Sequence, residues 1–373
     1  MLRAVAALGV GGLTIPFGRR RLGAEELGND IVGHLVCPSK SSGVRKTEAS
    51  IIELRDGRLL LAYSDFYTVS SDDAAPARIS GRYSSDMGKS WTEPFTIIQN
   101  TAKKNVMSVS MLRLNSGEIA LAYLYNESDE DGAVLFRTSR DEARTFSEPI
   151  KVSPRKSVWV MNNDRLVQLS SGRLLAPCQR LDDFPTVTHS LTEVLYSDDG
   201  GKTWGESSSV DIRKNHDGAD EPGVVELKDG RILMFFRTAL GAIYQSFSSD
   251  RGISWTEPEP MKLEAPMSPS LIKRIPSTGD LLIVWNHSLP HAHDNVQKDR
   301  FPLSSAISRD EARTWENIRD FETDARYTYA YPSITFLKDR VLISYWQCSG
   351  EWWFGLKVFS APVRWFYEHE NLR

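Results

Sequence analysis

The stretch Ser197-Asp198-Asp199-Gly200-Gly201-Lys202-Thr203-Trp204 is the fullest copy of a motif that occurs five times in this chain. The other copies are SSDMGKSW from Ser84, SRDEARTF from Ser139, SSDRGISW from Ser248 and SRDEARTW from Ser308. The motif predicts a tight turn, because Ser and Asp side chains accept backbone N–H groups and Gly adopts positive φ without strain. Ala replaces this Gly at positions 143 and 312, so we expect those two turns to be built a little differently.

A second pattern alternates with these turns: an apolar strand, a short turn and another apolar strand. Its six copies span residues 50–64, 110–124, 165–179, 223–237, 270–286 and 333–347. The first five contain a turn Gly, at positions 57, 117, 172, 230 and 279, and Asp339 continues the series in the sixth. Asp-Gly and Ser-Gly between β-rich runs are typical of hairpins.

Repeated hairpins of this kind predict an all-β fold. Four strands in each of six copies indicate a six-bladed β-propeller with four-stranded antiparallel blades, formed by a single domain over residues 29–373. Helical periodicity is almost absent, which disfavours a parallel α/β sheet. The sixth copy lacks the Ser-Asp motif, so we expect residues 356–363 to form a closing strand, with residues 31–37 as its partner.

The composition excludes several other classes of protein. A formal net charge of −4 leaves no excess of positive charge for a nucleic-acid backbone, so we expect no nucleic-acid partner. Cys37, Cys178 and Cys348 match neither a disulfide framework nor a metal site. We expect them to be buried thiols, and we expect no metal and no other cofactor.

Residues 1–28 form a separate N-terminal segment. Residues 4–17 are apolar and rich in Ala and Gly, and three arginines follow at 19–21. This run is too short to span a bilayer, so we expect no membrane span. It is similar to the hydrophobic part of an export signal, which predicts a periplasmic or secreted protein. A disordered tail is the alternative and leaves a cytoplasmic location open.

The eight-residue motif resembles the Asp-box of the sialidase (neuraminidase) superfamily, whose propellers are built from BNR repeats. In that superfamily the boxes lie at hairpin turns away from the propeller axis. The resemblance therefore implies that the Asp residues of the motif are structural and take no part in catalysis. Fold resemblance does not settle function, because one fold carries many activities.

The chemistry is expected where the first strand of each hairpin begins, because these strands line the axis of a propeller. Two residues before each hairpin, every copy has a polar residue. Strand side chains repeat every second residue, so all six should point the same way into a wet pocket. The six residues are Glu48, Ser108, Asn163, Glu221, Ser268 and Tyr331.

Several of these segments are similar to sialidase catalytic motifs. They are residues 220–227, Arg237 at the end of the following strand, Arg300 before the last Ser-Asp motif, and residues 331–334. The resemblance implies Tyr331 as nucleophile, with Tyr329 as a competitor, and Glu221 as its base. Arg237 and Arg300 would hold the carboxylate of a sialic acid by paired hydrogen bonds. A neutral Tyr avoids the repulsion that this carboxylate would exert on a carboxylate nucleophile.

The sequence departs from the family pattern in two places. The Arg-Ile-Pro motif of the first blade is absent, and Thr47 or Glu48 stands where its Arg would be, with Arg165 as a possible replacement. Arg78 stands where the family has its acid/base Asp, so Asp72, Asp73 and Asp65 become candidates for the acid. The other candidate substrate-binding residues are Arg78, Asp65, Asn163 and Asp164.

Three functional hypotheses follow. The first is a sialidase-like exo-glycoside hydrolase that acts on terminal acidic sugars of glycans. The second is a glycosidase for a different sugar that uses Glu48 and Glu221, on blades one and four, as a pair of carboxylates. The third is a carbohydrate-binding propeller without turnover. All three imply a glycan or oligosaccharide as the partner. A protein-interaction propeller is a further alternative, which the polar residues around the axis disfavour.

Overall fold

The computed structural model describes residues 31–39, 43–181, 190–212, 219–289, 299–350 and 352–368. These residues form β-strands joined by turns, a 3₁₀ helix, η2 (Val363–Tyr367), and no α-helix. No helix within these ranges is long and apolar enough to cross a membrane. The predicted export segment, residues 1–28, lies outside the described residues. The three cysteines are buried free thiols, as expected.

The strands belong to four hydrogen-bonded sheets. The eight-stranded sheet contains β23 (Thr328–Phe336), β24 (Arg340–Cys348), β25 (Phe354–Pro362), β1 (Val32–Cys37), β2 (Arg45–Glu53), β3 (Leu59–Phe66), β4 (Ala77–Ser84) and β5 (Phe95–Ile98). The nine-stranded sheet contains β6 (Asn105–Arg113), β7 (Ile119–Asn126), β8 (Gly132–Ser139), β9 (Ile150–Lys151), β10 (Val158–Val160), β11 (Val167–Gln168), β12 (Leu174–Leu181), β13 (Leu191–Ser197) and β14 (Gly205–Glu206). Two four-stranded sheets follow: β15 (Asp220–Glu226), β16 (Ile232–Arg237), β17 (Ala242–Ser248) and β18 (Glu259–Glu264), then β19 (Leu271–Arg274), β20 (Leu281–Trp285), β21 (Leu303–Ser308) and β22 (Glu316–Glu322).

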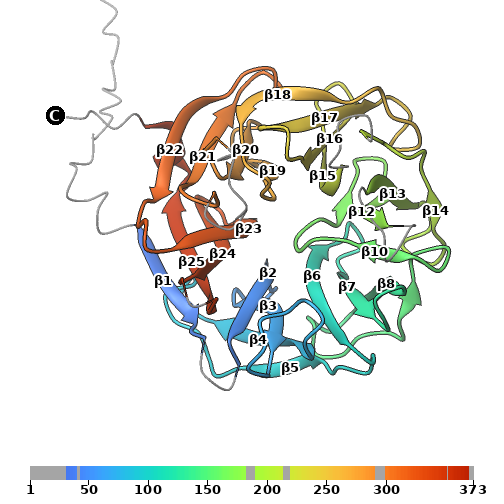
Figure 1. The fold of residues 1–373 in the computed structure, drawn as a ribbon, viewed down its shortest axis with the longest axis vertical. Helices are drawn as coiled ribbons and strands as arrows, with labels where there is room; N and C mark the ends of the chain where they lie inside the picture. The colour runs from blue at the N-terminus through green and yellow to red at the C-terminus, as the bar shows by residue number, and fades with distance from the viewer. Residues whose placement is uncertain are drawn as a thin grey trace, which may run out of the picture.

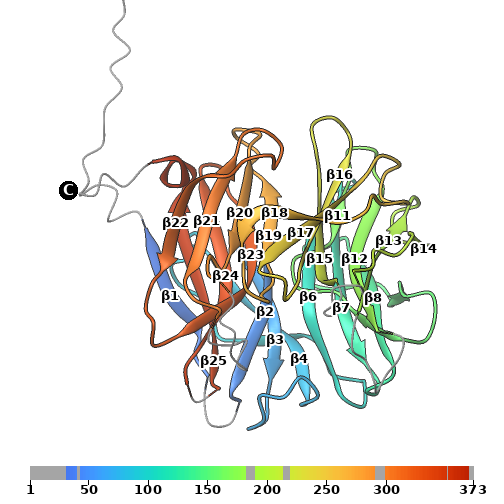
Figure 2. The same ribbon diagram turned by 45° about the horizontal axis from the view of Figure 1, so that its top comes forward.

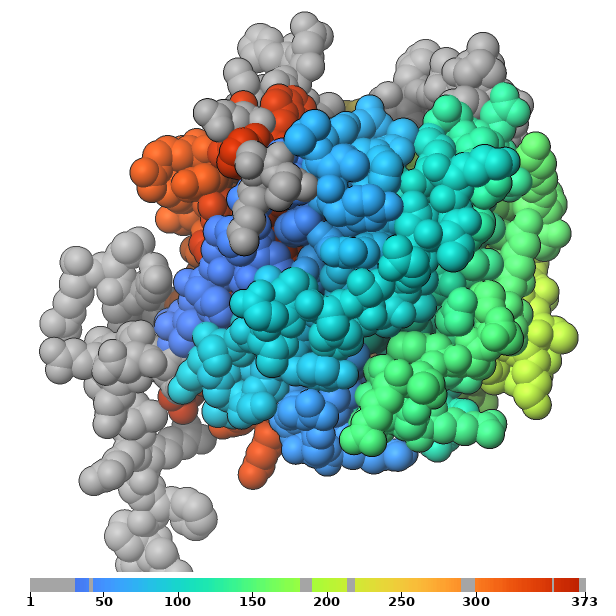
Figure 3. Space-filling model, turned by 90° about the horizontal axis from the view of Figure 1, so that it is seen from below, coloured from blue at the N-terminus to red at the C-terminus, as the bar shows by residue number. Residues whose placement is uncertain are grey.

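The sheets are arranged around a common centre (Figure 1), and β2, β6, β15, β19 and β23 lie nearest to it. The tilted view in Figure 2 shows the sheets side by side in the same circular order. From below, the blue, cyan and green segments cover the surface in chain order (Figure 3). This is a propeller-type all-β fold, and the hairpins predicted from the sequence are confirmed as the pairs β2/β3, β6/β7, β11/β12, β15/β16, β19/β20 and β23/β24.

The two ends of the domain meet in one sheet. Strand β1 pairs antiparallel with β25, with Val32 opposite Ser360 and Leu35 opposite Lys357. The predicted partnership between the closing strand and residues 31–37 is therefore confirmed. Apolar side chains fill the spaces between neighbouring sheets: Phe235, Trp285 and Tyr345, from β16, β20 and β24, belong to one buried cluster.

The Ser-Asp motifs form the predicted hydrogen-bonded turns. In the copy at 248–255, Ser248 Oγ donates to Asp250 Oδ1 at 2.7 Å, and the backbone N–H groups of Ile253 and Ser254 donate to the same oxygen at 3.0 and 2.9 Å. Partial burial opposes ionisation, but the hydrogen bonds outweigh it and lower the pKa of Asp250 to about 2. These turns lie at the ends of strands, and their role is structural.

We expected the two turns that contain Ala to be built differently, but they have the same hydrogen bond as the turns that contain Gly. Ala143 and Ala312 adopt positive φ of 62° and 66°, and their N–H groups donate to Ser139 and Ser308 Oγ at 2.9 Å. Gly252 makes the same bond, to Ser248 Oγ at 2.8 Å. The hydrogen bonds to the Ser side chain therefore hold the left-handed backbone even where a Cβ makes it unfavourable.

Replacement of Asp250 by Ala should destabilise the fold, because it removes the acceptor for two backbone N–H groups. We expect the free energy of unfolding to fall by about 1–3 kcal/mol. Denaturant titration would measure the change, and Glu257→Ala, an exposed carboxylate nearby, is the control, with a change within about 0.5 kcal/mol. Because the folded pKa of Asp250 lies below its ordinary value of 3.8, its contribution is complete above about pH 4. The difference in free energy of unfolding between wild type and Asp250→Ala should decrease as the pH falls from 4 towards 2. A difference that does not change with pH would contradict this prediction.

Candidate active site

Four polar residues near the centre have a left-handed backbone. Glu48, Ser108, Glu221 and Tyr331 have φ angles of 49°, 52°, 47° and 57°, and each lies at a register shift in its hairpin. A β-bulge re-aims a side chain, and positive φ in residues other than Gly concentrates at functional sites. All four residues line one hollow of about 370 Å³.

The bulges give a physical reason for this arrangement that the sequence analysis did not contain. Alternation along a strand selects these four residues, but the bulge, not regular alternation, orients them. In the third repeat the left-handed residue is Asp164, with φ of 58°, rather than Asn163. Ser268 is buried, donates to Asn286 Oδ1 at 2.5 Å and does not belong to the described lining of the site.

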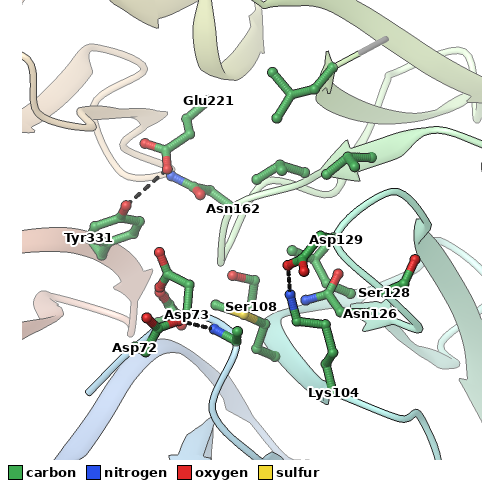
Figure 4. Close-up of a pocket in the computed structure, with 17 residues that line it drawn as sticks. Asp72, Asp73, Lys104, Ser108, Asn126, Ser128, Asp129, Asn162, Glu221 and Tyr331 are labelled. Atoms are coloured by element: carbon green, nitrogen blue, oxygen red, sulfur yellow. Dashed lines mark hydrogen bonds and ion pairs between the residues drawn. The ribbon is translucent and has the colours of Figure 1, made fainter. Parts of the chain in front are cut away.

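Tyr331 and Glu221, 110 residues apart in the chain, meet in this hollow (Figure 4). Tyr331 Oη donates a hydrogen bond to Glu221 Oε1 at 2.9 Å. Burial raises the pKa of Tyr331, and the charge of Glu221 raises it further, against the opposing charges of Arg237 and Arg300. The phenol is therefore neutral near pH 7, and its proton already points at a carboxylate.

Three guanidinium groups line an adjoining hollow of about 410 Å³, which shares Tyr331 with the first: Arg45, Arg237 and Arg300. Arg237 Nη1 lies 3.0 Å from Glu221 Oε2, and the Arg300 guanidinium lies 5.6 Å from the centre of the Tyr331 ring. The Nε atoms of Arg237 and Arg300 are buried and have no hydrogen-bond partner among the described residues. Converging cations with free donors can hold a carboxylate by charge-assisted hydrogen bonds. We call this adjoining space the arginine hollow.

Arg45 is the cation that the sequence reasoning missed. It begins β2, and its Nη2 lies 2.8 Å from Glu48 Oε1. Counting by alternation puts Arg45 and Glu48 on opposite faces of the strand, but the bulge at Glu48 brings them together. The signal in the sequence is an Arg three residues before a polar bulge position. Arg45 thus lines the arginine hollow with Arg237 and Arg300, whereas the sequence analysis had considered Arg165 as the third cation.

Arg165 does not replace the missing cation. It is buried, its Nη2 donates to the Ser270 carbonyl at 2.7 Å, and its guanidinium lies 5.7 Å from the Phe235 ring. Burial lowers its pKa to about 10, although the charges of Glu221 and Asp164 oppose this. Arg165 lies outside the described lining of both hollows, so it supports the site without facing a ligand.

Asp72 and Asp73 are neighbours in the loop between β3 and β4, and they differ in their contacts. Both line both hollows. Asp72 Oδ1 accepts the Ala74 N–H at 2.7 Å and so holds its own loop, whereas Asp73 forms an ion pair with Arg45. The walls of the site partly desolvate Asp73, which raises its pKa, but the charge of Arg45 outweighs this and lowers the pKa overall. Asp73 is the better candidate for the acid because it contacts a cation of the arginine hollow, whereas Asp72 binds its own loop.

Asp65 and Arg78, predicted to serve the substrate, are engaged with each other instead. Asp65 Oδ2 accepts Arg78 Nε at 3.0 Å and Ser80 Oγ at 2.7 Å, and Asp65 Oδ1 pairs with Lys46. Neither residue belongs to the described lining of the two hollows. These contacts tie β2, β3 and β4 together, and a role of Asp65 and Arg78 in substrate binding stays a prediction.

In the polar segment of the third repeat, Asn163 and Asp164 contact other strands, and their role in substrate binding stays a prediction. Asn163 Nδ2 donates to the backbone oxygens of Ala49 at 2.8 Å and Tyr331 at 3.3 Å, and Asp164 pairs with Lys273 Nζ at 2.6 Å. These side chains join neighbouring sheets. Asn162, which was not selected, lines the hollow, and its Nδ2 is buried without a hydrogen-bond partner in the described part of the chain.

Glu48 lines the first hollow but is held by its neighbours. It accepts hydrogen bonds from Arg45 Nη2 at 2.8 Å and Thr47 Oγ1 at 3.0 Å, and its side chain is 2% exposed. Burial raises its pKa more than Arg45 lowers it. Tyr329, the competitor for the nucleophile, is buried, donates to the Asp324 carbonyl at 3.3 Å and lies outside the described lining of the site.

The first hollow extends away from the arginines along an apolar wall of Met107, Leu124, Val158, Val160 and Leu181. Polar groups from Asn126, Ser128 and the Lys104–Asp129 ion pair face it, as Figure 4 shows. A mixed wall of this kind suits a ligand with both hydroxyl and apolar parts. Among the described residues, no group of three or more His, Cys, Asp or Glu side chains is placed to hold a metal ion.

Comparisons with known proteins agree with this architecture. A sialidase of Bacteroides fragilis is 24% identical over 223 residues, which are 57% of this chain and 39% of that protein. A sialidase of Paraclostridium sordellii is 25% identical over 239 residues, 57% of each chain. The chain thus spans less than two thirds of the length of these relatives.

Solved structures of the same fold include the NanB sialidase of Streptococcus pneumoniae, with a TM-score of 0.70 and 16% identity over 92% of this chain and 73% of that one. A Dyadobacter fermentans protein of unknown function has a TM-score of 0.70 and 20% identity over 89% of this chain and 98% of that one. At such identities the likeness establishes the fold. The family model of the BNR repeat-like domain matches residues 57–343. This chain therefore belongs to the BNR repeat-like domain family, within the sialidase superfamily.

Proposed function

We propose that the protein is an exo-sialidase that removes terminal sialic-acid-type sugars from glycans. One observation carries the proposal: the Tyr331 hydroxyl donates to Glu221 at 2.9 Å, at the edge of a hollow lined by three guanidinium groups. The arginines provide a site for a carboxylate, and the Tyr–Glu pair provides a neutral nucleophile with its base. Distant sialidase relatives support the same reaction class.

In the first step, the sugar carboxylate binds Arg45, Arg237 and Arg300. Tyr331 Oη attacks the anomeric carbon while its proton passes to Glu221, and the bond from that carbon to the leaving oxygen breaks as Asp73 donates a proton to it. In the second step, water gives a proton to Asp73 and attacks the same carbon. The bond to Tyr331 then breaks, and the phenol recovers its proton from Glu221.

The ion pair between Asp73 and Arg45 makes the acid depend on the substrate. Without a ligand, Arg45 lowers the pKa of Asp73, so the aspartate is ionised near pH 7 and cannot donate a proton. A substrate carboxylate on Arg45 would compete with Asp73 for the same guanidinium and add a negative charge nearby. Both effects raise the pKa of Asp73 and prepare it to protonate the leaving oxygen.

Two alternatives have less support. A glycosidase using Glu48 and Glu221 as a carboxylate pair needs both groups free for acid–base chemistry, but Glu48 is bound by Arg45 and Thr47. A neutral sugar would also offer no carboxylate to the buried Nε donors of Arg237 and Arg300, which have no hydrogen-bond partner among the described residues. A propeller that binds sugar without turnover would show binding and no released sugar.

We also propose that the four sheets correspond to six blades. The eight- and nine-stranded sheets each contain a single parallel residue pair, Arg45 with Phe354 and Val158 with Gly132. Division at these pairs leaves groups that match the six sequence repeats. The N-terminal strand β1 then counts with the last blade through its pairing with β25.

Tyr331→Phe and Glu221→Gln should each lower kcat by about 10²–10⁴-fold, because one removes the nucleophile and the other its base. Release of sugar from an aryl α-sialoside and from a sialylated oligosaccharide would measure this. Tyr329→Phe is the matched control and should stay within about twofold of wild type, since its hydroxyl lies outside the site. Hydrolysis that survives both Tyr331→Phe and Glu221→Gln would exclude the mechanism.

Asp73→Asn should lower kcat strongly for a sugar leaving group, by about 10²–10⁴-fold, and far less for a nitrophenyl group, which leaves without a proton. Asp72→Asn retains the acceptor for Ala74 and should affect both substrates little. In wild type, activity should fall at high pH as Asp73 loses its proton. This fall should occur at higher pH in the profile of kcat than in that of kcat/KM, because the bound substrate carboxylate raises the pKa of Asp73. If the two profiles fall at the same pH, the substrate carboxylate does not compete with Asp73 for Arg45.

A further inference from the structure

The hairpin between β24 and β25 exposes two neighbouring tryptophans. Trp352 and Trp353 are 49% and 38% exposed, respectively. Trp352 has a φ of 59°, which is a rare conformation for a bulky residue. Its N–H donates to the Ser349 carbonyl at 3.1 Å, and the Ser349 N–H donates to the Trp353 carbonyl at 3.3 Å, so a tight turn holds this geometry.

Only one of the two tryptophans faces the site described above. Trp352 is part of the described lining of the arginine hollow, whereas Trp353 is not. Aromatic rings connect Trp352 with the nucleophile: its centroid lies 6.3 Å from that of Phe354, which lies 5.1 Å from Trp346, which lies 6.2 Å from Tyr331. The ring of Trp352 is therefore the outer end of an aromatic wall that begins at the reacting hydroxyl.

Two unfavourable features coincide at Trp352, since a left-handed backbone and an exposed indole both oppose stability. Neither is needed to close the hairpin, because a residue such as Gly or Asn would adopt this φ with less strain. The combination indicates a ring that is held open for a ligand.

The chemistry of the proposed reaction says which part of the ligand would meet it. In a sialic acid, the carboxylate and the leaving oxygen are attached to the same carbon. When the carboxylate binds the three arginines, the leaving group must emerge from the arginine hollow. The proposed acid, Asp73, lines that hollow together with Ser71 and Trp352, so a leaving group that receives its proton from Asp73 would lie in a space that the indole also borders.

We propose that Trp352 is the platform for the leaving sugar, contacting the apolar C–H face of the residue to which the terminal acid is attached. This rests on the proposed function and extends it: the preferred substrate is a sialylated oligosaccharide rather than a sialic acid on a small alcohol. A large rigid ring gives such a contact with little loss of conformational entropy.

The test compares Trp352→Ala with Trp353→Ala, an equally large change at an exposed indole outside the hollow. For a sialylated disaccharide, Trp352→Ala should lower kcat/KM by about tenfold, as expected for one lost aromatic contact. For the methyl α-sialoside, whose leaving group cannot reach the indole, the change should stay within about twofold. Trp353→Ala should stay within about twofold on both, and Trp352→Phe should restore most of the preference.

If Trp352→Ala lowered kcat/KM equally for both substrates, the inference would be overturned, because Trp352 would then only support the arginine hollow. Values of kcat/KM that are unchanged in Trp352→Ala for both substrates would also overturn the inference. If wild type hydrolyses neither substrate, the proposed function fails, and calorimetric binding to Tyr331→Phe decides the inference separately. In that background, the sialylated disaccharide must bind more tightly than the methyl sialoside, and Trp352→Ala must remove the difference; otherwise Trp352 is not a sugar platform.

Discussion

The site depends on one backbone constraint: a residue in the left-handed region at a β-bulge near the start of the innermost strands. This conformation turns Glu48, Ser108, Glu221 and Tyr331 out of the regular pleat and towards the centre. The strands on either side of each bulge keep their antiparallel pairing and their buried apolar residues. The fold thus supports polar chemistry at its centre while its sheets remain well packed, since the irregularity is confined to one or two residues per strand.

Electrostatics in the site follow from this convergence. Three arginines, two glutamates, three aspartates and a phenol line the two hollows, and several of these charges form ion pairs. Arg237 lies beside Glu221, and Arg45 is held between Glu48 and Asp73. Buried charges require such partners. In the proposed mechanism, an incoming carboxylate exchanges one set of ion pairs for another, and the pKa of Asp73 rises as its pairing with Arg45 weakens.

Much of the fold was predictable, because its signals are local and repeated. Turn glycines, apolar strands and Ser-Asp turns recur with regular spacing, and even the pairing of β1 with β25 followed from an unpaired strand at each end. Glu221, Tyr331, Arg237 and Arg300 were found because they lie in segments with a recognisable pattern. Arg45 was missed because alternation fails at a bulge. Trp352 carries no signal in the sequence, since its position depends on the geometry of one hairpin.

The pairing of β1 with β25 has a consequence for how the molecule forms. In the eight-stranded sheet, β1 from the beginning of the described residues pairs with β25, which follows β23 and β24 near the end. During synthesis β1 has no pairing partner until more than three hundred further residues have been added to the chain. Such a distant contact is slow to form, and the exposed edge of β24–β25 is open to pairing with other chains in the meantime. Completion of this sheet joins both ends of the domain, so it is a natural final step of folding.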